Sequence, residues 1–167
     1  LRTDGHARRG RLTFRRGSVE TPAFMPVGTY GTVKSVTPEE VAADGADIIL
    51  GNTFHLMLRP GTGVIRKHGG LHQFMNWHGP ILTDSGGFQT LDGFFKQKSN
   101  EEGILMKSPF DGKTYVLTPE MAMDIQMTLA PDVAMCLDDV PRHDDDQKNI
   151  EEKTERTHRW ALRCKTH

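Results

Sequence analysis

Two aspartates in similar settings carry the strongest chemical signal in this sequence of 167 residues. Asp84 ends the apolar run that begins at Ile81, and Asp138 ends the run that begins at Asp132. Runs of this length predict buried strands, so each carboxylate is expected at the end of a strand. Two carboxylates facing one cleft can adopt different pKa values and act as acid, base or nucleophile. The pair indicates a catalytic cleft, and glycosyl chemistry is one use of that arrangement.

A structural interpretation of the same aspartates stays open, because aspartate also caps helices and turns. Asp139 adds a second ambiguity, since side chains alternate along a strand and Asp139 would point away from its neighbour. We therefore prefer Asp138 over Asp139 as the residue that faces the cleft.

The residues after Asp84 suit close approach of a ligand. Gly86 and Gly87 permit backbone conformations that are closed to other residues, and they let a ligand reach the main chain. Phe88 then either stacks on a planar ring or fills the core.

An amide and an imidazole follow the second predicted strand. Asn52 could orient Asp84 through a hydrogen bond. His55 is either a metal ligand or a structural histidine. No His-x-His pair or spaced His/Asp set accompanies it, so we expect no metal site in this chain.

The pattern behind these side chains is a strand followed by a helix, repeated four times. The predicted strands are 23–28, 47–52, 81–84 and 132–139, and the predicted helices are 37–45, 63–68, 118–129 and 147–163. Strands from Arg11 onward, joined by a turn at 16–18, precede this pattern, and a hairpin at 103–117 that turns at 111–112 interrupts it. Parallel strands would place Asn52, Asp84 and Asp138 at one sheet edge, where α/β proteins bind ligands.

Two architectures fit this α/β pattern. An open sheet of four units suits the length, whereas a (β/α)8 barrel of the TIM type needs about 250 residues. In a barrel, this chain would supply about the first four βα units, an N-terminal strand region and a hairpin insertion.

Composition is that of an ordinary soluble domain, with 36% hydrophobic residues and a net charge of −1. No apolar run approaches the roughly 20 residues of a membrane span, so we expect a cytoplasmic protein without a membrane partner. Cys136 and Cys164 lie in no Cys-x-x-Cys pair, which favours free thiols over a disulfide or a zinc site. Six arginines in the first 16 residues permit nucleic-acid binding without indicating it. The first residue, Leu1, indicates a processed or trimmed chain.

Several colinear segments resemble those of the tRNA-guanine transglycosylases, also called queuine tRNA-ribosyltransferases. These segments are 24–29, 49–56, 58–61, 82–89, 108–112, 117–120 and 137–140. The resemblance implies a (β/α)8 barrel of which residues 1–167 form the N-terminal half. It also implies that the nucleophilic aspartate and a structural zinc site lie in a second half absent from this chain.

The implied activity is exchange of the wobble guanine in a tRNA anticodon for a 7-deazaguanine base, through a covalent link between ribose and an aspartate. By resemblance, Asp84 contacts the base and transfers its proton, with support from Ser85 and Asn52. Phe88 stacks on the purine, and Asp138 reads the amino and ring NH groups of the base. Val140 stands where members that insert the smaller base preQ1 have cysteine, which favours queuine.

The resemblance further implies binding to the tRNA anticodon stem-loop, and a homodimer or a heterodimer with a homologous subunit. Two rivals remain: a non-catalytic tRNA-binding partner subunit of the same fold, and a glycoside hydrolase with a carboxylate pair. We expect residues 1–167 alone to be inactive and to fold poorly.

Overall fold

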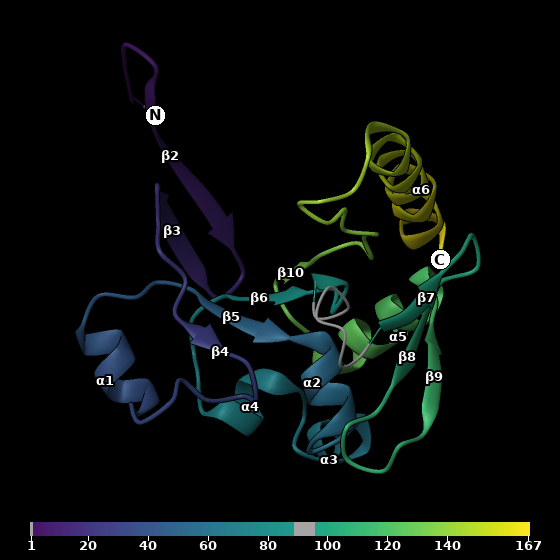
Figure 1. Ribbon diagram of the computed structural model, residues 1–167. Helices are drawn as coiled ribbons and strands as arrows, with labels where there is room; N and C mark the ends of the chain where they lie inside the picture. The colour runs from purple at the N-terminus through teal and green to yellow at the C-terminus, as the bar shows by residue number, and fades with distance from the viewer. Residues whose placement is uncertain (1, 89–95) are drawn as a thin grey trace. The chain divides into compact units, whose positions relative to one another are not determined.

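The computed structural model of the protein describes residues 2–88 and 96–167 (Figure 1). These residues divide into two units. The first unit contains Leu1–Thr83 and Thr128–Val133, and the second contains Asp84–Met127 and Ala134–His167. Gln89, the last residue of the segment 82–89 compared above, lies outside the described residues.

An antiparallel sheet opens the first unit. Its strands, in the order β1-β2-β3, are β1 (Arg2–Asp4), β2 (Ala7–Phe14) and β3 (Gly17–Thr21). The predicted hairpin is present, but its turn lies at residues 15–16, because Phe14 already pairs with Gly17. Gly17 has a φ of +138°, a backbone conformation that suits glycine. β1 was not predicted, since its polar sequence carries no apolar alternation.

The second sheet establishes the α/β class. Its order is β10-β6-β5-β4, formed by β10 (Val133–Ala134), β6 (Ile81–Asp84), β5 (Ile49–Asn52) and β4 (Val27–Gly28). β4 pairs with β5 in parallel. The four strands of this sheet lie side by side in the order in which they occur along the chain. Sequential order with helices between the strands is how a (β/α) barrel begins. Closure into a full barrel stays a prediction.

Four helices lie between β4 and β6. They are α1 (Pro38–Ala43), α2 (Thr53–Leu58), α3 (Thr62–Lys67) and α4 (Leu71–Met75). The predicted start of α1 is confirmed as a capping box, in which Glu40 N–H donates to Thr37 Oγ1 at 3.2 Å and Thr37 N–H donates to Glu40 Oε2 at 2.8 Å. α3 is also confirmed, whereas α2 and α4, of six and five residues, were not predicted.

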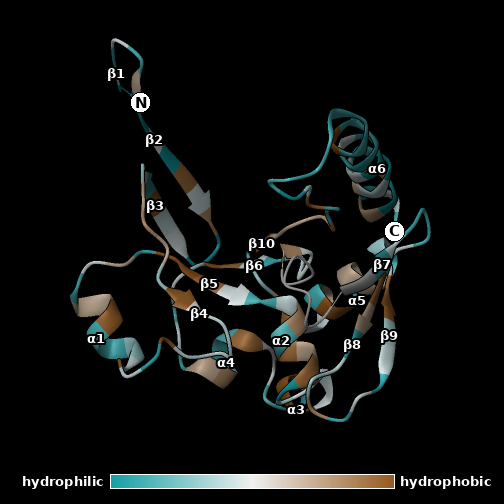
Figure 2. Cartoon of the chain, viewed as in Figure 1, coloured by the Kyte–Doolittle hydropathy of each residue, from teal (hydrophilic) through white to brown (hydrophobic). Residues whose placement is uncertain are grey.

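The second unit contains the predicted hairpin and two long helices. The elements are β7 (Lys96–Ser99), β8 (Ile104–Lys107), β9 (Thr114–Leu117), α5 (Pro119–Leu129) and α6 (Gln147–Thr166). β7 extends the hairpin to a three-stranded antiparallel sheet in the order β7-β8-β9. Figure 2 shows α6 as a mostly hydrophilic helix, and its buried residues recur every four positions, at Arg156, Trp160 and Cys164.

The prediction of a strand over 132–139 is wrong for most of that range, because β10 ends at Ala134. At the next residue, Met135, a side chain forms the backbone hydrogen bonds that a neighbouring strand would otherwise form. Gln126 of α5 accepts from Met135 N–H at 3.0 Å and donates to Met135 O at 2.9 Å. Residues 135–146 therefore form an irregular loop, called here the Asp138 loop, which leads into α6.

Candidate functional site

The second unit joins the turn after β6 to the Asp138 loop. Ser85 Oγ donates a hydrogen bond of 2.8 Å to Asp138 Oδ1, and Gly87 N–H donates to Ser85 Oγ at 3.1 Å. Ser85 is buried and Asp138 is half-buried. The serine hydroxyl therefore holds one oxygen of the Asp138 carboxylate in place.

Asp84 closes a tight turn of its own. Gly86 N–H donates to Asp84 Oδ1 at 3.1 Å, the bond that defines an Asx turn. The turn-capping interpretation of Asp84 is therefore present in the structure. It also holds the half-buried Asp84 carboxylate in one orientation, which a proton-transfer group needs.

Gly87 is required by the approach of Asp138. A Cβ built on Gly87 would overlap Asp138 Oδ1 and lie 2.6 Å from the Asp138 carbonyl oxygen. Any larger residue would have to push the Asp138 loop away from Ser85. The glycine thus serves packing between two loops of the site, a role that sequence alone did not show.

The neighbouring carboxylates of Asp138 and Asp139 have different partners. The Asp139 side chain is fully buried, pairs with Arg156 Nη1, and accepts from Ser99 Oγ at 2.9 Å. Its backbone N–H donates to Thr157 Oγ1 at 2.9 Å. Asp139 is thus part of the interior, which leaves Asp138 as the carboxylate of the pair that solvent reaches.

Phe88 and Val140 differ in exposure. Phe88 is 67% exposed, so it does not fill the core of its unit. Val140 is half-buried within the Asp138 loop. Their expected contacts with a base stay predictions.

Asn52 belongs to the first unit, where it caps α2. His55 N–H donates to Asn52 Oδ1 at 2.9 Å, and the Asn52 side chain is buried. The expected bond from Asn52 to Asp84 stays a prediction, because the two residues belong to different units.

His55 lies against an aromatic partner. Its Nδ1 is 3.1 Å from the hydroxyl of Tyr30, and the two rings meet edge to face. Burial lowers the pKa of His55 below the usual histidine range. Within residues 2–88 and 96–167, no three His, Cys, Asp or Glu side chains come together as a metal site.

The two cysteines are free thiols, as predicted. Burial, and then the nearby charge of Asp138, raise the pKa of the Cys136 thiol. A raised thiol pKa disfavours the thiolate, which is the nucleophilic form.

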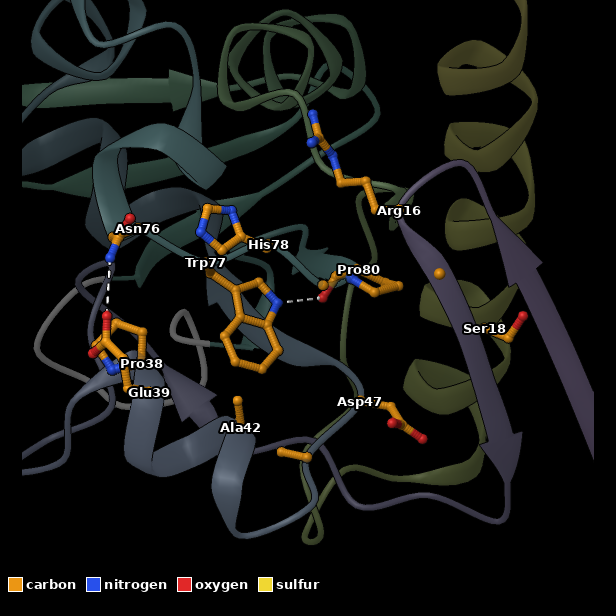
Figure 3. A pocket seen from close by; sticks show the side chains of 13 residues that line it. Arg16, Ser18, Pro38, Glu39, Ala42, Asp47, Asn76, Trp77, His78 and Pro80 are labelled. Carbon is orange, nitrogen blue, oxygen red and sulfur yellow. Dashed lines mark hydrogen bonds between the residues drawn. The ribbon is translucent and has the colours of Figure 1, made fainter.

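A separate hollow of about 440 Å³ lies at the amino-terminal ends of β5 and β6 (Figure 3). Its wall carries Trp77, whose indole N–H donates to the Pro80 carbonyl at 3.0 Å, and Asn76, which donates to Glu39 at 3.0 Å. The predicted site residues follow the carboxyl ends of the strands instead. The hollow is therefore not the candidate site.

A pair of buried His72 and half-buried Asp132 near those amino-terminal ends was also missed by sequence reasoning. His72 Nε2 lies 2.9 Å from Asp132 Oδ2, which also accepts from Ile81 N–H at 2.9 Å. Burial, and then the charge of Arg16, lower the pKa of His72, while Asp132 opposes the change. Asp132 thus fixes the start of β6, which makes the pair a structural element.

The missed residues nearest the candidate site are Arg156, Thr157 and Ser99. The first two lie on α6, which the sequence presents as a polar helix with few apolar residues. The available signal was the four-residue spacing of Arg156 with Trp160 and Cys164. That spacing places an arginine on the buried stripe of the helix.

Residues 4–167 match the family described as queuine tRNA-ribosyltransferase. Relatives named queuine tRNA-ribosyltransferase from Psychromonas ingrahamii and Azotobacter vinelandii are 56% and 57% identical over 165 residues. One from Pseudoalteromonas translucida is 56% identical over 163 residues. These alignments cover 98–99% of this chain and 44% of each relative, so the chain spans less than half their length. No helix among the described residues is long and apolar enough to cross a membrane.

Proposed function

This chain belongs to the queuine tRNA-ribosyltransferase family, and we propose that the complete protein containing it exchanges a tRNA base. The reaction is a pentosyl transfer: the wobble guanine of the anticodon leaves and a 7-deazaguanine base takes its place. The observation that carries the proposal is the Ser85–Asp138 hydrogen bond beside the Asp84 turn. It presents an oriented carboxylate next to a second one on a glycine-lined turn.

Asp138 is the base-recognition residue in this proposal. A carboxylate accepts two parallel hydrogen bonds from the amino and ring NH groups of a guanine edge. Ser85 holds Oδ1 and so sets the plane of the carboxylate. Phe88, exposed beside the turn, stacks on the purine.

Asp84 moves the proton. In the first step, an aspartate outside residues 1–167 forms a bond to the ribose C1′ as the bond from C1′ to guanine N9 breaks. Guanine leaves after Asp84 supplies a proton, and Asp84 then takes a proton from the incoming base. That base displaces the aspartate from C1′ and completes the exchange.

A structural zinc ion belongs to the complete protein in this proposal, with ligands outside residues 1–167. Among the described residues, neither Cys136 nor Cys164 belongs to a group of three His, Cys, Asp or Glu side chains that could hold a metal ion. Binding of the tRNA anticodon stem-loop, dimer formation and a cytoplasmic location belong to the same proposal.

The test is incorporation of labelled guanine into tRNA by the complete protein. Asp84→Asn should lower the rate at least 100-fold, the usual effect of removing a proton-transfer group. Asp138→Asn should raise the KM for the base by roughly 10- to 100-fold. Asp144→Asn is the matched control, since Asp144 is exposed in the same loop, and it should change neither value.

The outcomes separate the rival functions. Binding of tRNA without exchange would indicate a non-catalytic partner subunit. Release of sugar without tRNA would indicate a glycoside hydrolase. The same assay with queuine and preQ1 tests the expectation for Val140, which is lost if preQ1 is incorporated more efficiently.

A further inference from the structure

The loop that presents Asp138 has almost no regular structure, yet it is held at several points. Leu137 is fully buried, and Met135 is fixed through both of its backbone groups by Gln126. Apart from the bond that Ser85 donates to Asp138 itself, the nearest attachment is at the neighbouring residue Asp139. Contacts that hold Asp139 therefore also restrain the backbone next to Asp138.

Asp139 is fixed from α6 and β7. Its carboxylate accepts from Arg156 and Ser99, and its N–H donates to Thr157. A buried carboxylate needs such partners, because removal from water strongly penalises an unpaired charge. Two consecutive residues of α6 thus hold the side chain and the backbone of one loop residue.

The guanidinium of Arg156 is shared among acidic groups. Nη1 pairs with Asp139, Nη2 pairs with Glu152 one turn earlier on α6, and Nε lies 3.9 Å from Glu101. Arg156 is buried, and Nε has no hydrogen-bond partner among the described residues. The planar fork is thus oriented by its two Nη bonds, a geometry that a lysine ammonium cannot reproduce.

From this arrangement we propose that Arg156 and Thr157 are positioning residues for base recognition. They hold Asp139 so that the adjacent Asp138 meets Ser85 and presents its carboxylate to the 2-amino edge of the base. The inference rests on the proposed function for the identity of the base. It predicts that changes on α6, in residues that do not touch the base, alter the selectivity of Asp138.

The readout is the ratio of the affinities of the complete protein for guanine and for hypoxanthine, which lacks the 2-amino group. Calorimetry measures both dissociation constants. A ratio is independent of the fraction of folded protein, so a merely structural role would leave it unchanged. The affinity ratio measured for Asp138→Asn gives the value expected when the 2-amino group is no longer recognised.

Arg156→Lys keeps the charge and loses the fork, and it should lower the guanine preference about tenfold, since a misplacement near 1 Å costs up to about 100-fold. Thr157→Val is nearly isosteric and removes only the acceptor for Asp139 N–H. It should lower the preference about threefold, and it decides the question if Arg156→Lys fails to fold.

Arg159→Lys is the matched control. Arg159 lies on the same helix and binds Glu101 through two bonds of 2.9 Å. Arg159→Lys should leave the ratio of the guanine and hypoxanthine affinities within twofold of the wild-type value. A guanine preference that survives both Arg156→Lys and Thr157→Val would overturn the inference. Selective base binding without exchange into tRNA would instead count against the proposed function alone.

Discussion

At the scale of single residues, burial separates two adjacent carboxylates that have the same chemistry. Asp139 is enclosed with Arg156 and Ser99, so its charge stabilises the loop only while those partners remain. Asp138 keeps access to solvent and shares one oxygen with Ser85. A ligand can therefore compete for Asp138 and not for Asp139.

We expect Gly87→Ala to disable this arrangement. The added methyl group would overlap Asp138 Oδ1 and lie 3.2 Å from Ser85 Oγ, so the Ser85–Asp138 bond has to break. Forcing a methyl group into packed surroundings costs about 1–3 kcal/mol of unfolding free energy. We expect base exchange to fall more than tenfold. Chemical denaturation and the guanine assay measure the two effects.

Gly63→Ala provides the matched control for that substitution. Gly63 lies inside α3, and a Cβ there meets no atom within 4 Å. Alanine should stabilise the helix by about 0.5–1 kcal/mol without changing the exchange rate. Equal losses of activity in both variants would contradict the role assigned to Gly87.

At the scale of elements, Trp160 and Arg163 hold α6 to other parts of the second unit. Trp160 Nε1 donates to the Glu101 carbonyl at 3.0 Å, and Arg163 Nη1 donates to the same oxygen at 2.7 Å. Arg163 also forms two bonds of 2.7 Å with Glu120 in the first turn of α5. The helix that carries Arg156 is therefore anchored at both α5 and the β7–β8 turn.

The Glu120–Arg163 pair predicts a pH-dependent contribution to stability. The hydrogen bonds from Arg163 lower the Glu120 pKa from 4.5 to about 2. A lowered carboxyl pKa stabilises the fold above pH 4.5, and that contribution is lost as the pH falls toward 2. Since both side chains are 34% exposed, water screens the pair, and we expect Glu120→Gln to cost about 1 kcal/mol at pH 7.

Urea unfolding of the wild type and of Glu120→Gln at pH 7, 5 and 4 measures this contribution. The difference in unfolding free energy should stay constant from pH 7 to 5 and shrink at pH 4. Addition of 1 M NaCl should reduce it at pH 7. A difference that grows on acidification would show that another group dominates.

Local signals predicted elements well where the deciding contacts are local. Thr37 and Glu40 supply both halves of the cap of α1, three residues apart. The failed strand at 132–139 depended on Gln126, whose amide replaces a strand partner from nine residues away. The anchor of Asp139 depends on Ser99 and Arg156, 40 and 17 residues away. No local pattern reveals such partners.

At the scale of the whole molecule, several large apolar side chains of the described residues are exposed. Phe24, Met127 and Leu162 are 81%, 75% and 63% exposed. The chain also covers only 44% of the length of its relatives. We infer that the remaining part of the complete protein covers some of these side chains, with Phe24 as the most exposed candidate.

A comparison of Phe24→Ser in two polypeptides tests this inference. Residues 1–167 expressed alone should bind a dye for apolar surfaces, melt without a sharp transition and lack base exchange, and Phe24→Ser should reduce the dye binding. In the complete protein, a covered Phe24 predicts a loss of about 2–3 kcal/mol of unfolding free energy, whereas an exposed one predicts a change within about 0.5 kcal/mol. A sharp cooperative melt of monomeric residues 1–167, with a negligible effect of Phe24→Ser in the complete protein, would show that these residues form a self-sufficient fold.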